Sequence, residues 1–487
     1  MRAAKNILLV FILLLQGLFS AAQIKFQRTY EIGLSCEGRC VKQTFDGGYV
    51  IAGTESGIGS GSSKVYLLKV DSFGNFLWHK IFGGLNIDRG YSVTQLNDSG
   101  YAVCGYTNSL GNGGYDGYLI RTDKNGDTLW TKTYGTTDWD FLYSLTKTSD
   151  GGFAMAGGTY GLGSADEDVY IVKTNQSGDV MWEKHYGFSG KDVANEIIET
   201  SDFNLLVIAN TENAASMNDV YFLKLNSLGD TILTKTFGGS GDDIGMSVKE
   251  TFTHEYVLSG HSNSTTSGDY NEMTIETDLA GNQIWSRDLG GPSNEIVNHF
   301  ITCADGGFAS CGKFDGSGAG GYDMRLEKVM IGGWSQWSHT FGGANDDEAF
   351  HTEQTSDSGY VLVGYTRSFG NYADQIFLVK TDSIGSTDTS LVHSVISVDE
   401  LINNSHSYSC LSLLNMPNEI SFRLSNDFRI TNGLLNIFDS QGKLVRSLTD
   451  DGLTFKLLKA SLTDGIYFYN LTEKNASICS GKFNIIR

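Results

Sequence analysis

The sequence is poor in proline, in cysteine and in positive charge. Only two of its 487 residues are proline, Pro292 and Pro417, which indicates neither a proline-rich linker nor a disordered chain. Seven cysteines are too few for a disulfide framework to organise a chain of this length. Lysine and arginine number 35 against 56 acidic residues, a formal net charge of −21. Such a charge disfavours nucleic acid and anionic membrane surfaces as partners.

No apolar run reaches the ~20 residues that a membrane-spanning helix needs. Near the start, Arg2 and Lys5 precede an unbroken apolar stretch from Ile7 to Leu15, and small residues follow it up to Ala22. This order predicts a secretory signal peptide at residues 1–22, cleaved near Ala22. The mature protein is therefore expected to be secreted, with no transmembrane segment.

Glycine, in contrast, is abundant and regularly placed. Its 60 copies are about 12% of the chain, against a usual ~7%. Many of them lie in copies of one motif, such as "SDGGFAMAGGT" from Ser149 and "FDGGYVIAGTE" from Phe45. The residue after each glycine turn recurs at intervals of 51 or 52 residues, at Tyr49, Tyr101, Phe153, Leu205, Tyr256, Phe308 and Tyr360. Seven copies at one period predict one structural unit used seven times.

Each copy is typical of four short strands joined by tight turns. Four antiparallel strands per repeat of this length predict a β-propeller blade, and seven blades closing into a ring would bury each face against a neighbour. The last copy stops at Gly385 without its fourth strand, while a matching strand opens the mature chain at Ile24. We therefore expect an all-β, seven-bladed propeller at 23–385, whose N-terminal strand completes the last blade and removes a free edge.

Tryptophan recurs at one position of the fourth strand. Copies stand at Trp78, Trp130, Trp182, Trp285 and Trp337, with Leu233 in the remaining complete repeat. One fixed position in blade after blade predicts packing between blades rather than a ligand platform. The pattern "YLIRTDKNGDTLWTKTYG" with "DGGYVIAG" resembles the propeller repeats of secreted Bacteroidota proteins and, more distantly, the quinoprotein blade. The resemblance covers residues 24–385 and implies a fold more than a function.

Composition changes after Gly385. Residues 386–400 carry no repeat marker and are expected to be a linker. Alternating apolar residues and glycine turns then predict a small antiparallel β-sandwich at 401–487. This segment resembles the type A C-terminal sorting domain of the type IX secretion system, on Gly442 and Lys443 in "D-x-x-G-K" and Gly465 and Tyr467 in "L-x-x-G-I-Y". The resemblance implies that the type IX machinery is a partner, recognising residues 401–487.

Two rings of side chains are candidate sites. Carboxylates recur at the start of each innermost strand, at Asp88, Asp140, Asp192, Asp243, Glu295 and Asp347. They would hold calcium if they gathered at one channel mouth, or accept backbone N–H groups in their own loops. Four residues further on, Cys40, His299 and His351 fall on three adjacent blades of the closed ring. Imidazole and thiolate would suit a transition metal such as zinc or copper if all three faced the channel; otherwise they are contacts between blades.

Other chemistry leaves little trace. There is no G-x-S-x-G, H-E-x-x-H or P-loop motif. We predict no catalytic residue and no cofactor. Cys303 with Cys311, and Cys410 with Cys479, are candidate disulfides. The leading hypothesis is a non-catalytic binding or scaffold propeller whose ligand is a glycan or a protein held at a loop-rich face. The alternative is an extracellular enzyme, a polysaccharide hydrolase or a metal-dependent oxidase, that uses the propeller channel.

Overall fold

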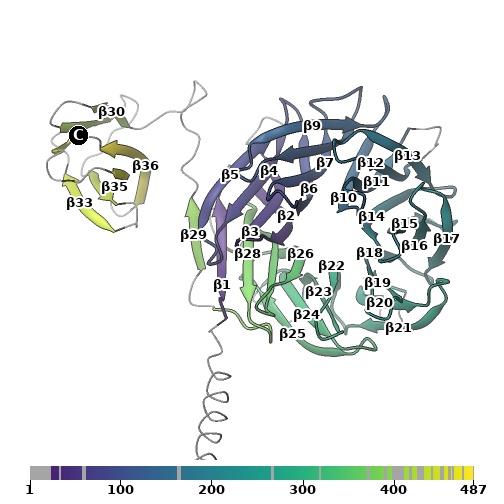
Figure 1. The fold of residues 1–487 in the computed structure, drawn as a ribbon. Coiled ribbons are helices and arrows are strands. Elements are labelled where there is room, and N and C mark those ends of the chain that lie inside the picture. The colour runs from purple at the N-terminus through teal and green to yellow at the C-terminus, as the bar shows by residue number, and fades with distance from the viewer. Residues whose placement is uncertain are drawn as a thin grey trace, which may run out of the picture. The chain divides into compact units, whose positions relative to one another are not determined.

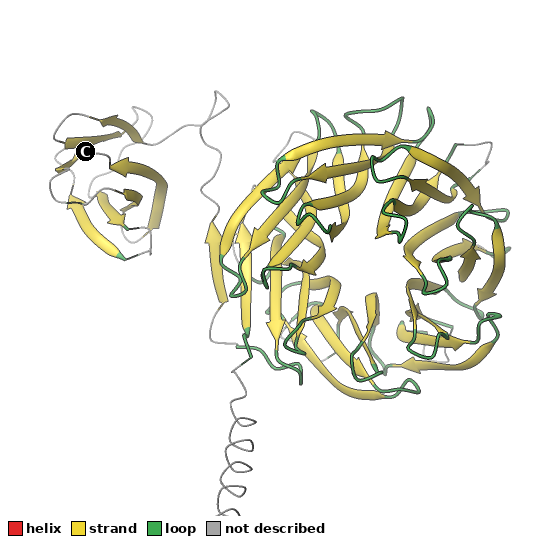
Figure 2. Cartoon of the chain, viewed as in Figure 1, coloured by secondary structure: helices red, strands yellow, loops and turns green. Residues whose placement is uncertain are grey.

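The computed structural model describes residues 23–388, apart from gaps at 32–34, 57–61, 162–165, 216, 265–267, 317–319 and 370–372, and shorter segments between 392 and 485. The expected signal peptide at 1–22 lies outside the described residues. The chain divides into two compact units, residues 1–395 and 396–487. The regular elements of the described part are strands (Figure 2), and no helix there is long and apolar enough to cross a membrane.

The first unit is a ring of seven antiparallel blades, as the 52-residue period predicts (Figure 1). Six blades are continuous in sequence, and each runs from an innermost first strand to an outermost fourth strand. Blades 1 to 3 comprise β2 (Ser35–Gln43), β3 (Tyr49–Ser56), β4 (Ser63–Val70), β5 (Phe76–Phe82), β6 (Asp88–Gln95), β7 (Tyr101–Thr107), β8 (Asp116–Thr122), β9 (Thr128–Tyr134), β10 (Asp140–Lys147), β11 (Phe153–Thr159), β12 (Asp168–Thr174) and β13 (Val180–Tyr186). Blades 4 to 6 comprise β14 (Asp192–Glu199), β15 (Leu205–Glu212), β16 (Asn218–Leu225), β17 (Thr231–Phe237), β18 (Asp243–Glu250), β19 (Tyr256–Ser262), β20 (Asn271–Thr277), β21 (Gln283–Leu289), β22 (Glu295–Thr302), β23 (Phe308–Phe314), β24 (Asp323–Val329) and β25 (Ser335–Phe341).

The seventh blade joins the two ends of the repeat region. It contains β26 (Asp347–Gln354), β27 (Tyr360–Thr366) and β28 (Gln375–Thr381), and β1 (Phe26–Glu31) pairs antiparallel with β28. The register sets Phe26 opposite Lys380, as Trp130 is set opposite Arg121 in blade 2. The prediction that the N-terminal strand completes the last blade is confirmed. A fifth strand, β29 (Val392–Ile396), lies beyond β1 in the same sheet, within the segment expected to be a linker.

The fourth-strand tryptophans pack between blades, as expected. Trp78 of blade 1 lies against a cluster that holds Val93, Tyr101 and Ile120 of blade 2, and Trp337 of blade 6 contacts Tyr360 of blade 7. In the last blade Phe26 takes the same position. A Cβ on Gly74, which has a φ of +75°, would lie only 2.8 Å from the Phe26 ring. Glycine in this turn therefore gives each fourth-strand ring room to lie on the next blade.

Each innermost strand contains a β-bulge against its neighbour. The register shifts between Gly38 and Cys40 in β2, and between Val297 and His299 in β22, so that one extra residue stands in the innermost strand. The same shift occurs at the equivalent place in the other five blades. The extra residues are Arg39, Tyr91, Tyr143, Asn195, Met246, Asn298 and Phe350. Because a bulge re-aims side chains, these seven positions shape the channel.

The second unit contains two small antiparallel sheets, as a sandwich requires. One is built from β30 (Leu411–Asn415), β31 (Glu419–Leu424) and β34 (Thr454–Leu458), and the other from β32 (Gly433–Phe438), β33 (Leu444–Thr449), β35 (Gly465–Glu473) and β36 (Ala476–Ile485). Phe422 and Phe455 of the first sheet share a core with Leu435 and Tyr469 of the second.

The motif residues of this second unit fall on its hairpins. Lys443 donates its backbone N–H to Asp439 Oδ1 at 3.0 Å, which closes the turn between β32 and β33. Tyr467 is buried on β35, and Gly465 begins that strand. Gly442 lies outside the described residues.

The candidate disulfide between Cys303 and Cys311 is not formed, because both are free, buried thiols. Cys303 lies at the hairpin turn, where its N–H bonds Gly307 O, whereas Cys311 is paired with His299 further along β23. Three residues of extended strand past Phe308 carry Cys311 about 10 Å away, beyond disulfide reach. Cys303 instead lies 3.7 Å from the Tyr360 hydroxyl of the next blade. The other candidate pair includes Cys410, which lies outside the described residues.

Candidate functional site

The recurrent carboxylates close loops inside their own blades. Asp88 Oδ2 accepts the backbone N–H of Gly84 at 2.8 Å, and Asp243 Oδ2 accepts that of Gly239 at 2.7 Å. Asp140, Asp192 and Asp347 accept the equivalent N–H groups. Their other contacts include second-strand hydroxyls, such as that of Ser262 on Asp243 Oδ1 at 2.5 Å. This is the turn role weighed above, and among the described residues no group of three or more His, Cys, Asp or Glu is arranged to hold a metal ion.

A cavity lies where the innermost strands face one another. It has a volume of about 580 Å³ and is lined by residues of all seven blades. The innermost strands β2, β6, β10, β14, β18, β22 and β26 surround this central region (Figure 1). All seven bulge residues line it, together with most of the residues that follow them and most of those two positions further on; Ser247 and Glu353 are the exceptions. We call this cavity the channel.

The residues that follow the bulges hold neighbouring blades together. Ser144 Oγ accepts the backbone N–H of Ile197 in the next blade at 3.1 Å, and Ser247 Oγ accepts that of Phe300 at 3.1 Å. Glu196 Oε2 accepts the N–H of Val248 at 2.8 Å. The ring of positions that follow the bulges therefore makes hydrogen bonds from blade to blade, which is one of the two alternatives given for it above.

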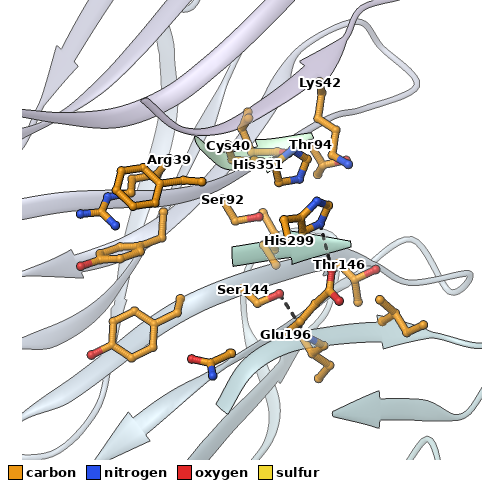
Figure 3. A pocket seen from close by; sticks show the side chains of 18 of the residues that line it. Arg39, Cys40, Lys42, Ser92, Thr94, Ser144, Thr146, Glu196, His299 and His351 are labelled. Carbon is orange, nitrogen blue, oxygen red and sulfur yellow. Dashed lines mark hydrogen bonds and ion pairs between the residues drawn. The ribbon is translucent and has the colours of Figure 1, made fainter. Parts of the chain in front are cut away.

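The three metal candidates lie in this ring, on the same side of the channel (Figure 3). The rings of His299 and His351 stack with centroids 3.8 Å apart and planes 19° apart. Cys40 Sγ donates to Val93 O of the next blade at 3.8 Å. His299 Nδ1 accepts the Thr352 N–H at 3.4 Å. Stacked imidazoles direct their in-plane lone pairs side by side rather than toward one ion, so this arrangement suits packing better than chelation.

One carboxylate faces these imidazoles. Glu196 Oε1 lies 3.4 Å from His299 Nε2 and is paired with Lys249 Nζ. Burial opposes ionisation of Glu196, but Lys249 and His299 outweigh it and hold its pKa at about 2. Burial lowers the pKa of His299 to about 4 although Glu196 acts in the other direction. Burial, with His299 and Lys42 adding to it, also lowers the pKa of His351. At neutral pH the site therefore holds an ion pair beside two uncharged imidazoles.

Aromatic bulge residues form a continuous arc along one side of the channel. The Arg39 guanidinium lies 3.9 Å from the Phe350 ring centroid and 5.5 Å from that of Tyr91. Tyr91 in turn meets Tyr143 edge to face at 4.9 Å. We call Phe350, Arg39, Tyr91 and Tyr143 the channel arc. Four adjacent blades, from the seventh through the first to the third, contribute one residue each.

The channel arc continues onto one face of the ring. This long-loop face carries the loops that precede each innermost strand and the loops between second and third strands. Five further aromatic residues of blades 2 and 3, the rim cluster, lie in mutual ring contact there: Tyr106, Tyr115, Trp139, Phe141 and Tyr160. Tyr106 stacks on Tyr91 at 5.7 Å and so joins the rim cluster to the channel arc. Trp139 remains 51% exposed and Tyr160 39% exposed.

Sequence reasoning missed both aromatic groups, although the repeat alignment contains their signal. The counterparts of Trp139 in other blades are Ile87, Lys191, Asp242, Asn294 and Asp346. The counterpart of Tyr143 in blade 4 is Asn195. Aromatic residues therefore stand at these positions only in part of the ring. A position where one sector departs from the repeat is a better indicator of a site than one that every copy shares.

Comparison with known proteins shows the fold alone. No protein-family model matches the chain, and no curated protein matches it. Solved structures that resemble it include PorZ, an essential surface component of the type-IX secretion system of Porphyromonas gingivalis, at 11% identity, with 91% of this chain and 58% of that chain covered and a TM-score of 0.40. They also include the periplasmic gluconolactonase PpgL of Pseudomonas aeruginosa, at 13% identity, 69% and 97% coverage and a TM-score of 0.43.

The WD40 domain of Neurospora crassa Pan2 is a further similar structure, at 10% identity, 71% and 90% coverage and a TM-score of 0.45. The match to PorZ covers 58% of that protein, so the chain spans little more than half the length of PorZ. At such identities the likeness extends to the propeller fold and says nothing of a ligand or an activity.

Proposed function

We propose that this chain is a secreted or surface-displayed propeller that binds a glycan at the long-loop face and does not cleave it. The observation that carries the proposal is the unbroken run of aromatic rings from exposed Trp139 and Tyr160 to Tyr91 and Tyr143 inside the channel. Nothing in the interior of a blade requires these rings, because other blades fold without them.

Carbohydrate is the ligand class that suits this surface. Sugar rings present flat faces of C–H groups, which pack on the electron-rich faces of aromatic rings. Their hydroxyl groups need partners at the edges. The polar side of the channel offers the side-chain amide oxygens of Asn195 and Asn298, whose N–H groups bond the neighbouring blades. A concave site with aromatic walls and a few polar groups is the usual form of a small-molecule site.

The alternative of a polysaccharide hydrolase receives less support. Most glycoside hydrolases use two carboxyl groups, one of which stays protonated to act as an acid. Among the described residues that line the channel, Glu196 is the single carboxylate, and its pairing with Lys249 keeps it ionised. A two-carboxylate mechanism therefore has no second group there.

The test is glycan binding by the purified protein, measured on a glycan array and then by calorimetry. We expect Trp139→Ala to weaken binding about fivefold, because one stacking contact contributes about 1 kcal/mol. Trp334→Ala is a matched control, since Trp334 is similarly exposed, at 57%, on a turn of the opposite face. Equal loss in both variants, or no glycan binding by the wild type, would refute the proposal.

We further propose that residues 401–487 act as a type IX sorting domain in a protein of a Bacteroidota species. The support is the "D-x-x-G-K" and "L-x-x-G-I-Y" resemblance, together with the compact unit at 396–487 in which Tyr467 contributes to the core. A domain with its own core is able to be recognised and removed without disturbing the propeller.

Export of truncated chains tests this second proposal. In a host that has the type IX machinery, deletion of residues 401–487 should leave the propeller in the periplasm, and a reporter fused to 401–487 should reach the cell surface. Export of the deleted chain at the wild-type level would contradict it.

A further inference from the structure

The charge of the channel is opposite to that of the chain. Within a protein of net charge −21, the described residues that line the channel include four cations, Arg39, Lys42, Lys147 and Lys249, and one carboxylate, Glu196. Positive charge in the channel of an acidic protein is not needed for solubility. Because low-dielectric walls focus the field of these charges, the channel attracts anions.

The ion pairs of these cations leave an excess of positive charge. Arg39 pairs with Glu37, Lys42 lies 3.7 Å from Glu353, and Lys249 pairs with Glu196. Lys147 donates to the uncharged Asn97 side chain at 2.8 Å. Each ammonium has three N–H donors, so pairing with one carboxylate does not exhaust either Lys42 or Lys249.

Two of the cations lie further from the long-loop face than the channel arc does, and the Lys42 side chain is still 34% exposed. Lys42 and Lys249 stand two residues after Cys40 and Ser247 on β2 and β18, on the channel side of their strands. Figure 3 shows Lys42 at the same end of the cavity as His351. Burial, with Lys42 adding to it, lowers the pKa of Lys249 although Glu196 acts in the other direction. Burial opposes ionisation of Lys42, but Glu353 and Glu196 outweigh it and raise its pKa. Both ammonium groups line the channel, where an anion between them would contact two cations.

We infer that the glycan is an acidic oligosaccharide whose terminal sugar carries a carboxylate, which Lys42 and Lys249 bind while the neighbouring sugar stacks on Tyr91 and Tyr143. This inference rests on the proposed glycan-binding function. Two to three residues of strand separate the arc from the two lysines, roughly 7–10 Å. That depth accommodates one terminal sugar ring between the aromatic contact and the ammonium groups.

The experiment compares uronic acid oligosaccharides with their methyl esters, which have the same rings and linkages without the charge. Calorimetry with the full mature chain uses galacturonate, glucuronate and mannuronate oligomers, each in both forms, and a glutamate oligopeptide. We expect at least one acid oligomer to bind at least tenfold more tightly than its ester and than the peptide, with an affinity that falls as salt is added.

Substitutions assign the charge effect to the channel. Lys42→Gln should weaken binding of the acid form about tenfold and leave the ester unchanged, while Lys42→Arg should retain most of the affinity. Lys80→Gln is the matched control, because it removes the same charge from an exposed pair with Asp127 on an outer strand and should change nothing. Thermal melting of each variant shows that it is folded.

The outcomes separate the two levels of the argument. Esters that bind as well as acids, with binding still lost in Trp139→Ala, would overturn the acidic-sugar inference and leave the glycan function standing. Preference for the glutamate peptide would overturn the sugar assignment. An absence of binding to every uronic acid oligomer would overturn the acidic-sugar inference, and an absence of binding on the glycan array as well would overturn both proposals.

Discussion

Closure of the propeller by the N-terminal strand β1 can be tested by removing one aromatic side chain from the contact between β1 and blade 1. Phe26 is 1% exposed and packs on Tyr49 and Gly74 of blade 1, and Tyr30 donates its hydroxyl to Gly74 O at 2.8 Å. Tyr134 makes the equivalent bond to Gly178 O within the continuous part of the chain. The contact between β1 and blade 1 thus repeats a contact that blade 2 makes with blade 3 in the continuous part of the chain.

The structure sets the size of the expected loss. Phe26→Ala removes a fully buried aromatic ring and should cost about 3–5 kcal/mol of unfolding free energy. Tyr30→Phe leaves a buried carbonyl without its donor and should cost about 1–3 kcal/mol. Since natural domains are stable by about 5–15 kcal/mol, Phe26→Ala should lower the urea midpoint by a large fraction.

Tryptophan fluorescence is the appropriate assay. All seven tryptophans lie between Trp78 and Trp337, within the first compact unit, so the signal reports the propeller alone. Phe73→Ala, at a neighbouring turn where the ring is 57% exposed, is the control and should lie within about 0.5 kcal/mol of wild type. A Phe26→Ala protein that unfolds at the same urea concentration as this control would refute closure by β1.

Three further outcomes follow from individual residues. Metal analysis of the purified protein should find no stoichiometric transition metal, with His299→Ala and His351→Ala unchanged from wild type; metal lost in both variants would show that the imidazoles chelate after all. Burial would raise the pKa of Asp150, but Lys173, Thr148 and the Gly152 N–H outweigh it and hold that pKa at about 2. The stability that ionised Asp150 contributes should therefore be lost as pH falls from about 4 to 2. Asp150→Asn should flatten that decline in a series of melting curves at different pH. Burial, opposed by Arg325 and reinforced by Glu327, raises the pKa of Glu272 to about 7. Ionising Glu272 as pH rises costs stability, so the stability of Glu272→Gln relative to wild type should increase between pH ~5 and ~8. A stability difference that stays constant with pH would argue against a buried protonated acid.

The positions that build the propeller could be predicted from the sequence because they recur at intervals of 51 or 52 residues. Tyr49 and its six counterparts, the fourth-strand tryptophans and the carboxylates of the inner-strand loops serve the same contact in blade after blade, so their repetition predicts that contact. The same reasoning placed His299 and His351 on adjacent blades. It did not predict that their rings stack or that Glu196 approaches them, because side-chain directions depend on the bulge that shifts each inner strand.

The aromatic groups were less accessible to sequence reasoning. Tyr91 and Tyr106 are 15 residues apart in sequence, and Trp139 lies 33 residues beyond Tyr106, within a chain that has 57 aromatic residues of three kinds. Nothing local marks them as neighbours. Only the pairing of β6 with β7 and the docking of blade 2 on blade 3 bring Tyr91 and Tyr106 to 5.7 Å and link Tyr106 to Trp139 through Tyr115, at 5.3 and 5.6 Å.

By itself, the sequence determined an all-β ring of seven blades, its closure by the first strand and a separate small β unit, because a repeat that cannot bury its own faces has to stack on copies of itself. The tertiary structure decided which side chains meet at the centre. Seven strands from distant parts of the chain converge there, and a one-residue bulge in each selects the side chain that lines the channel. That selection sets an aromatic arc beside partly exposed lysines in an acidic protein, a juxtaposition that no local pattern in the sequence encodes.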